Sequence, residues 1–191
     1  HQSVRDWLPA QPTGKRGVVL VHGFMCNRGL WLPWMERLRA SGHAYVAVNL
    51  EPVFGSIDDY APLVEDAVLR VTAATGMAPL LIGHSMGGLA IRAWLRTYQS
   101  DTRMHHAITL GTPHGGTWAG RFSRAVNGRQ MALHGDWVGA LGGAEPPGRA
   151  RPLHPPDGNL WQPGADRARE GRRGPAHGCA QGTGAPAGRL R

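Results

Sequence analysis

The sequence contains little lysine, little cysteine and no long hydrophobic run. Lys15 is the one lysine among 21 basic residues, and the two cysteines, Cys26 and Cys179, form neither a CxxC pair nor a Cys/His cluster. This scarcity excludes a disulfide-stapled mini-protein and a structural zinc module. No apolar run reaches the ~18 residues that a membrane-spanning helix needs, so no transmembrane segment is predicted. The first residue is His rather than Met, so a leader could precede it and the compartment is left open.

The last 51 residues, 141–191, also lack most core-forming side chains. They contain no Val, Ile, Phe, Met or Tyr, and 19 of the 51 are Gly or Pro. Such a segment cannot bury enough apolar surface to offset the entropy lost on ordering, so we expect a poorly ordered tail after a folded core at 1–140. The net charge is +8, but the arginines of the tail are interleaved with Gly and Pro and have only Trp161 as an aromatic neighbour. We therefore expect no nucleic-acid partner.

Within 1–140, apolar runs typical of buried strands alternate with helical patterns. Continuous β-branched runs predict strands that are buried on both faces, and apolar side chains every three or four residues predict helices. This alternation predicts an α/β fold with a doubly wound, mostly parallel sheet. No further buried strand is predicted after 106–110, so we expect the sheet to lack its last strands or to leave them disordered. If a frameshift has replaced the natural carboxyl-terminal strands, 106–110 should form an exposed edge. The expected strands are 17–21, 44–48, 79–82 and 106–110, and the expected helices are 31–40, 57–74 and 86–98.

Two of these helices have a clear apolar stripe. Asp58 and Asp59 lie in the first turn of the second helix, where the helix dipole favours carboxylates. The stripe of that helix consists of Ile57, Tyr60, Ala61, Val64, Ala67, Val68 and Val71. The stripe of the first helix consists of Trp31, Trp34, Met35 and Leu38.

A serine motif lies between the third strand and the third helix. Gly83-His84-Ser85-Met86-Gly87 matches G-x-S-x-G, in which the serine occupies a tight strand-to-helix turn. Such a turn projects the Ser85 hydroxyl at the carboxyl end of the sheet, with a helix amino terminus behind it that favours developing negative charge. The motif therefore predicts Ser85 as a nucleophile.

A second motif follows the first strand. Acyl transfer places negative charge on the former carbonyl oxygen, which needs two preorganised N–H donors. We expect these donors to be the amides of Met86, just after the nucleophile, and of Phe24, after Val21-His22-Gly23. The alternative is that His22 and Gly23 only end the strand, with a satisfied histidine.

Residues 17–118 resemble the α/β-hydrolase fold, and specifically bacterial triacylglycerol lipases and related esterases. The resemblance lies in the stretches 19–24 (VLVHGF), 81–88 (LIGHSMGG) and 110–116 (LGTPHGG). It implies Ser85 as the nucleophile, the amides of Phe24 and Met86 as an oxyanion hole, and a 111–116 loop beside the nucleophile. It also implies a catalytic acid and then a histidine, both later in the chain than the serine.

The acid and the histidine have to come from residues after the fourth strand. Asp157 lies in a stretch that resembles the acid loop of these lipases, and His177 ends a Gly-x-x-His that resembles the one carrying their catalytic histidine. We predict Asp157 and His177, with His134 and His154 as open alternatives for the base. Asp101 precedes the fourth strand and so lies at the wrong end of the sheet. No histidine has a metal-binding spacing such as HExxH, so no metal is expected.

The resemblance implies a carboxylic ester hydrolase that acts on acylglycerols or other lipidic esters through an acyl-enzyme, without a cofactor. The partner expected for the protein is a small-molecule ester or lipid, and we also expect transient contact with a lipid surface. The oligomeric state is left open.

Residues 119–141 are expected either to form a lid or to complete the core. The alternative function is a catalytically incomplete protein of this fold: a fragment, a chain with an out-of-frame tail, or a binding module. The predicted substrate-binding residues are His22, Gly23, Met25, Trp31, His114 and Trp118.

Overall fold

The computed structural model describes residues 5–99, 101–143, 152–153 and 159–161. Its centre is a six-stranded sheet in the order β2-β1-β3-β4-β6-β5, in which β1 to β4 are parallel. The four expected strands are confirmed, with ends that differ by at most two residues from the predicted ones. The strands are β1 Val18–Val21, β2 Tyr45–Val48, β3 Leu80–His84, β4 His106–Leu110, β5 Pro152–Leu153 and β6 Asn159–Trp161.

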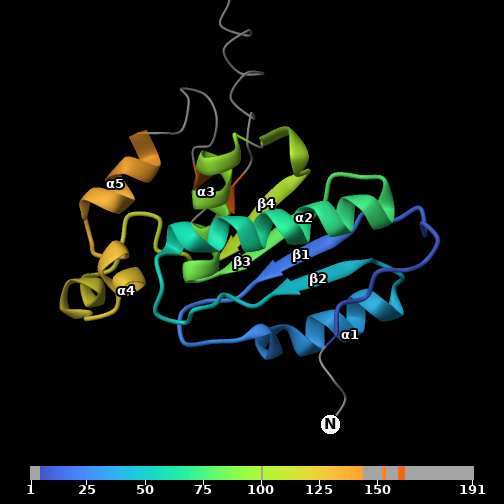
Figure 1. Cartoon of the computed structure of the whole chain (residues 1–191), viewed down its shortest axis with the longest axis horizontal. Coiled ribbons are helices and arrows are strands. Elements are labelled where there is room, and N and C mark those ends of the chain that lie inside the picture. Colours follow the sequence, from blue (N-terminus) through green and yellow to red (C-terminus); the bar gives the residue numbers. More distant parts are fainter. Residues whose placement is uncertain (1–4, 100, 144–151, 154–158, 162–191) are drawn as a thin grey trace, which may run out of the picture.

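Both faces of the parallel sheet are covered, as a doubly wound fold requires. Successive strand residues point to opposite faces, so Val19 and Val21 pack towards α2 (Ala61–Thr75) and α3 (Met86–Tyr98), whereas Val18 and Leu20 pack towards α1 (Leu32–Ala40). Figure 1 shows α2 and α3 on one side of the strands and α1 on the other. The prediction of an α/β fold with buried, mostly parallel strands is therefore confirmed.

Two predicted helices begin with a 3-10 turn. Residues Ile57–Tyr60 form η2 and continue into α2, and every side chain of the predicted stripe from 57 to 71 is at most 1% exposed. In the first helix, Trp31 belongs to η1 (Arg28–Trp31) and is buried with Met35, but Trp34 is 43% exposed. The Trp34 ring still contacts that of Trp31 edge to face, with 5.6 Å between centroids, so Trp34 lies at the exposed border of the predicted stripe. No helix in the described ranges is long and apolar enough to cross a membrane.

The outer edge of β4 is paired, contrary to the expected exposed edge. β6 runs antiparallel to β4, with Asn159 opposite Thr109, and β5 runs antiparallel to β6. Only five residues separate β5 from β6, which is enough for an antiparallel pair and too few for the crossover that a parallel pair needs. The predicted poorly ordered tail otherwise lies outside the described residues.

A short amino-terminal segment covers the outer edge of β2. Trp7 and Tyr45 exchange two backbone hydrogen bonds of 3.0 and 2.9 Å. The Asp6 carboxylate accepts a 3.1 Å bond from the Ala47 amide and forms ion pairs with Arg28 and Arg70. The segment is thus fixed to β2 by both backbone and side-chain contacts.

Candidate active site

Ser85 occupies the turn between β3 and α3 with φ 51° and ψ −122°, a backbone conformation that is unfavourable for a residue with a side chain. Three hydrogen bonds hold it there. The Ser85 amide donates to the Leu110 carbonyl at 2.8 Å, and the Ser85 carbonyl accepts from the Thr112 hydroxyl at 2.8 Å and from the Gly88 amide at 3.1 Å. The loop after β4 therefore lies directly beside Ser85.

The turn packs against the end of β1 without space for side chains. A Cβ on Gly87 would lie 2.3 Å from the Val21 carbonyl oxygen, and a Cβ on Gly23 would lie 2.9 Å from the Ser85 Cβ. Only glycine permits such approaches between backbones. Close packing at these two positions brings the strand end that carries Phe24 next to Ser85.

Ser85 faces a cavity of about 400 Å³. Phe24 also lines it, together with the loop after β4 and a segment that we call the cap, residues 117–143. Most of the lining side chains are small, which leaves the volume free for a ligand. The lining residues are Phe24, Ser85, Gly111, Pro113, Thr117, Ala119, Gly120, Ser123, Gly128 and Met131.

Two amides near Ser85 have no backbone acceptor among the residues that the structure describes. Met86 is the first residue of α3, and the first amides of a helix have no partner within it. Within the described ranges, the Phe24 amide donates no backbone hydrogen bond. The placement of both residues is compatible with the predicted oxyanion hole, which stays a prediction.

The His22 side chain is fixed by hydrogen bonds at the end of β1. It is 2% exposed, its Nε2 accepts a 3.0 Å hydrogen bond from the Leu50 amide, and its Nδ1 lies 2.8 Å from the Gly23 carbonyl oxygen. Since Nε2 accepts, the proton of the neutral ring is on Nδ1, which donates to Gly23. Burial lowers the pKa of His22. Both ring nitrogens of His22 form hydrogen bonds within the fold. His22 is thus a satisfied histidine, as the alternative interpretation of this motif expects.

The other predicted substrate-binding residues lie outside the cavity lining. Trp31 is 2% exposed in the core beneath α1, so it has a packing position. The His114 Nε2 lies 3.0 Å from the Thr109 hydroxyl. Met25 and Trp118 are 67% and 66% exposed. The small cap residues that do line the cavity were missed, because they form no periodic pattern in the sequence.

The acid and the base are not placed by the structure. Asp157, His177 and the alternative His154 lie outside the described residues, and no described side chain hydrogen-bonds the Ser85 hydroxyl. His134 is exposed, and its amide donates to the Gly115 carbonyl at 3.3 Å. Asp101 lies in η3 (Asp101–Arg103), directly before β4 and at the opposite end of the sheet from Ser85, as predicted. Among described residues, no three His, Cys, Asp or Glu side chains gather as metal ligands.

The cap both completes the core and borders the cavity. It contains η4 (Trp118–Phe122), α4 (Val126–Gln130) and α5 (Asp136–Gly143), and Figure 1 places α4 and α5 at the end of the sheet towards which the strands point. Backbone hydrogen bonds join Thr117 to the residues that follow α4. The Thr117 amide donates to the Met131 carbonyl at 2.7 Å, and the Leu133 amide donates to the Thr117 carbonyl at 2.9 Å. Met131, Val138 and Leu141 are buried, so one side of the cap belongs to the core.

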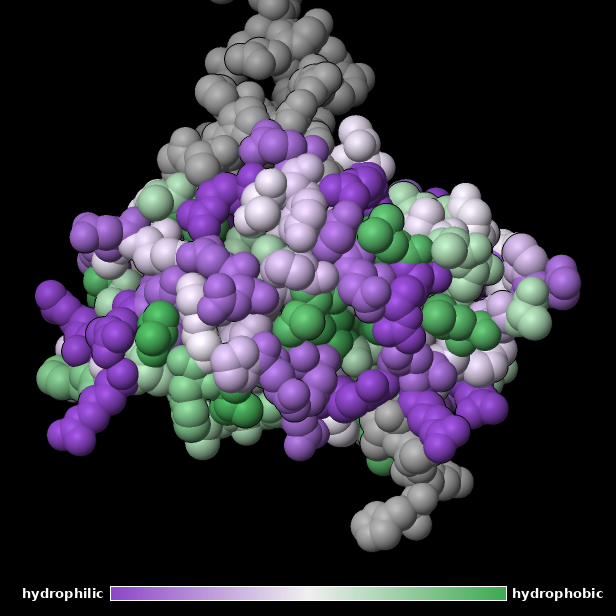
Figure 2. Space-filling model, in the orientation of Figure 1, coloured by the Kyte–Doolittle hydropathy of each residue, from purple (hydrophilic) through white to green (hydrophobic). Residues whose placement is uncertain are grey.

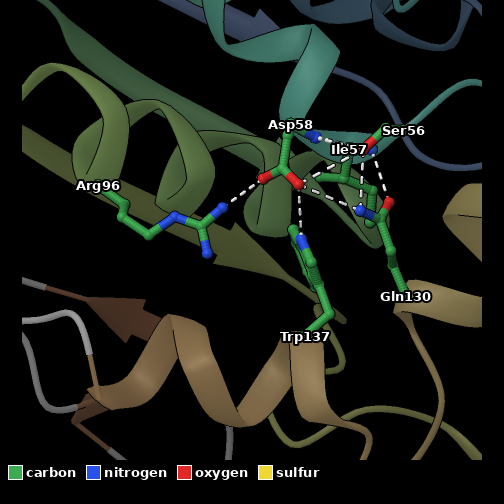
Figure 3. Close-up of polar contacts among 6 residues, drawn as sticks. All are labelled: Ser56, Ile57, Asp58, Arg96, Gln130 and Trp137. Atoms are coloured by element: carbon green, nitrogen blue, oxygen red, sulfur yellow. Dashed lines mark hydrogen bonds and ion pairs between the residues drawn. The ribbon is translucent and has the colours of Figure 1, made fainter.

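Asp58 anchors the cap to the rest of the molecule (Figure 3). Its carboxylate pairs with Arg96 of α3 and accepts hydrogen bonds from the Trp137 indole at 2.8 Å and the Gln130 amide at 3.2 Å. Gln130 also donates to the Ser56 hydroxyl at 2.8 Å and accepts from the Ile57 amide at 2.7 Å. The predicted helix-dipole position of Asp58 is correct, but these contacts with the cap were missed.

Solved lipase structures share the architecture. Mature Bacillus licheniformis lipase BlEst2 superimposes with a TM-score of 0.60 over 71% of this chain and 61% of the lipase, at 17% sequence identity. Aspergillus fumigatus lipase B superimposes with a TM-score of 0.59 over 73% of this chain and 38% of that lipase, at 18% identity. At these identities the likeness establishes the fold alone.

Sequence relatives cover less of the chain. The rice protein "Probable esterase PIR7A" (Oryza sativa subsp. indica) is 32% identical over 87 residues, which are 41% of this chain and 32% of the rice protein. The chain thus matches about a third of the length of that relative. The sequence model of the Alpha/beta hydrolase family matches residues 18–189, which include β1 to β4 and the Ser85 turn. This chain belongs to the alpha/beta hydrolase family.

Proposed function

We propose that the protein is a carboxylic ester hydrolase that uses Ser85 as its nucleophile. The observation that carries this proposal is the Ser85 turn: a serine in an unfavourable backbone conformation, fixed by three hydrogen bonds, at the wall of a cavity of about 400 Å³. Strained residues persist where the surrounding structure holds them, and they cluster at active sites.

In this mechanism, the Ser85 oxygen attacks the ester carbonyl carbon while a histidine takes the hydroxyl proton. The carbonyl oxygen becomes an oxyanion that the amides of Phe24 and Met86 stabilise, aided by the amino terminus of α3. The tetrahedral intermediate expels the alcohol, which receives the proton from the histidine. Water then attacks the acyl group on Ser85 with the same histidine as base, and the acid product leaves.

The proposed base is His177, oriented by Asp157, and both assignments rest on the sequence pattern alone. His154 and His134 are the alternative bases. A histidine in this role needs a carboxylate on its second ring nitrogen to hold the correct tautomer. The proposed substrates are lipidic or other carboxylic esters. The lining of the cavity by small side chains favours them, and two relatives of similar fold are named as lipases.

The chain offers a matched pair of serines for the test. Ser85 and Ser123 line the same cavity, so a fluorophosphonate probe that enters it reaches both. We expect the probe to label Ser85, and Ser85→Ala to abolish both labelling and the hydrolysis of a short p-nitrophenyl ester. Ser123→Ala should retain both. Labelling of Ser123 in place of Ser85, or no labelling of folded protein, would contradict the proposal and favour a catalytically incomplete protein.

A further inference from the structure

The outer face of the cap exposes large apolar side chains next to the cavity. Trp118 and Phe122 are 66% and 69% exposed, and Val126 is 43% exposed. The rings of Trp118 and Phe122 contact each other edge to face at 4.8 Å between centroids. Their chain neighbours Thr117 and Ser123 line the cavity. Exposed apolar groups that gather beside a cavity are typical of an interaction surface.

The same segment of the cap is basic. Arg121, Arg124 and Arg129 are all exposed, and none of them forms an ion pair with any residue that the structure describes. The sequence has no Asp or Glu between Asp101 and Asp136. Figure 2 shows hydrophobic and strongly hydrophilic residues interspersed at the end of the molecule where Figure 1 places α4. A segment that exposes both aromatic rings and positive charges complements a surface that is apolar within and negative at its headgroups.

We propose that this face of the cap docks on an anionic lipid surface, with Trp118 and Phe122 entering the headgroup region and the arginines contacting phosphates. The proposal rests on the proposed ester hydrolysis, for which it names the partner surface. Aromatic side chains favour the membrane interface, and arginine keeps its charged end in the headgroup layer while its stem packs on apolar groups. Docking here would bring the wall of the cavity that contains Thr117 and Ser123 to the lipid.

Helix α1 provides an internal control of similar composition. Trp34, Arg37 and Arg39 are also exposed there, but Glu36 lies among them and the Trp34 ring packs against Trp31 at 5.6 Å. Figure 1 shows α1 away from α4, on the other side of the sheet from α2. Variants on the two surfaces therefore distinguish specific docking through the cap from nonspecific adhesion by arginine and tryptophan side chains.

The test is flotation of the full chain with vesicles of phosphatidylcholine, with or without phosphatidylglycerol. We expect flotation with the anionic vesicles only, and its loss at high salt. Phe122→Ala and the pair Arg121→Gln/Arg124→Gln should each weaken this binding by about tenfold. Trp34→Ala and the pair Arg37→Gln/Arg39→Gln should leave it unchanged.

Hydrolysis of a short, water-soluble ester by each variant is measured in parallel, which shows that the variant is folded and tests the proposed function separately. Equal binding to neutral vesicles, no binding to either, or equal losses in the α1 variants would overturn the docking proposal. If the protein bound an acidic protein or a nucleic acid but not the anionic vesicles, the docking proposal would also be overturned. Loss of ester turnover in Ser85→Ala with flotation intact separates docking from catalysis.

Discussion

The Trp137 indole donates a 2.8 Å hydrogen bond to the Asp58 carboxylate, across 79 residues of sequence. Because Asp58 also pairs with Arg96 of α3, one carboxylate connects α3, the start of η2 and the cap. The wall of the candidate cavity therefore depends on a group that is distant from Ser85 in the sequence and contributes nothing to the cavity lining.

Asp58→Ala should lower the free energy of unfolding by about 1–3 kcal/mol, because four donors, on Ser56, Arg96, Gln130 and Trp137, lose their acceptor. Asp59→Ala is the matched control, since Asp59 lies in the same first turn and is exposed. It should cost only the helix-dipole contribution, about 0.3–1 kcal/mol. Urea unfolding of the two variants decides the point, and equal losses would show that the contacts with the cap add nothing.

Gly87→Ala should prevent the Ser85 turn from forming, because the added Cβ would lie 2.3 Å from the Val21 carbonyl oxygen. We expect a loss of soluble protein or a fall in melting temperature of more than 10 °C, together with loss of probe labelling. Gly139→Ala in α5 should do the opposite. Among the described residues, no atom outside its own helix lies within 4 Å of the added Cβ, so the higher helix propensity of alanine should raise stability by about 0.5–1 kcal/mol. A harmless Gly87→Ala would contradict the close packing.

His22 should make stability depend on pH on the acid side. Its pKa is lowered in the folded state by burial, so the unfolded chain binds the proton more readily. The stability is fully present above the unfolded pKa of about 6.5 and declines as the pH falls below it, until the folded-state pKa is passed. His22→Gln removes the titrating group, and its unfolding free energy should change less between pH 7.5 and pH 5 than that of the unmodified protein. Identical slopes would exclude His22 as the source.

Ser85→Ala and His177→Ala should each lower ester hydrolysis by several orders of magnitude, and the double variant should be little worse than either, because triad members act as a unit. Asp157→Asn should also lower turnover, whereas Asp166→Asn, a carboxylate in the same segment, should not. An active His177→Ala variant would move the base to His154 or His134, and a rate series with alanine at each position would identify it.

Local patterns were enough to predict the strands, the helix stripe from 57 to 71 and the position of Ser85, because neighbouring residues decide them. The contacts of Asp58 with Gln130 and Trp137 join residues 72 and 79 positions apart, and no periodicity reports such contacts. The cavity lining was missed for a related reason. Gly120 and Gly128 line the cavity with backbone alone, and a Cβ on either would meet neighbouring atoms, 2.6 Å from the Ala132 nitrogen and 1.9 Å from the Ser123 hydroxyl, respectively. An analysis of apolar stripes does not detect such residues.

The pairing at the two edges of the sheet has a consequence for association between chains. An exposed strand presents free N–H and C=O groups on which another copy can add a strand, the first step of edge-to-edge aggregation. Here Asp6 and Trp7 occupy the outer side of β2, and β6 occupies that of β4. The remaining edge, β5, is two residues long and begins with Pro152, which has no N–H to offer. All four parallel strands are thereby shielded from edge-to-edge pairing.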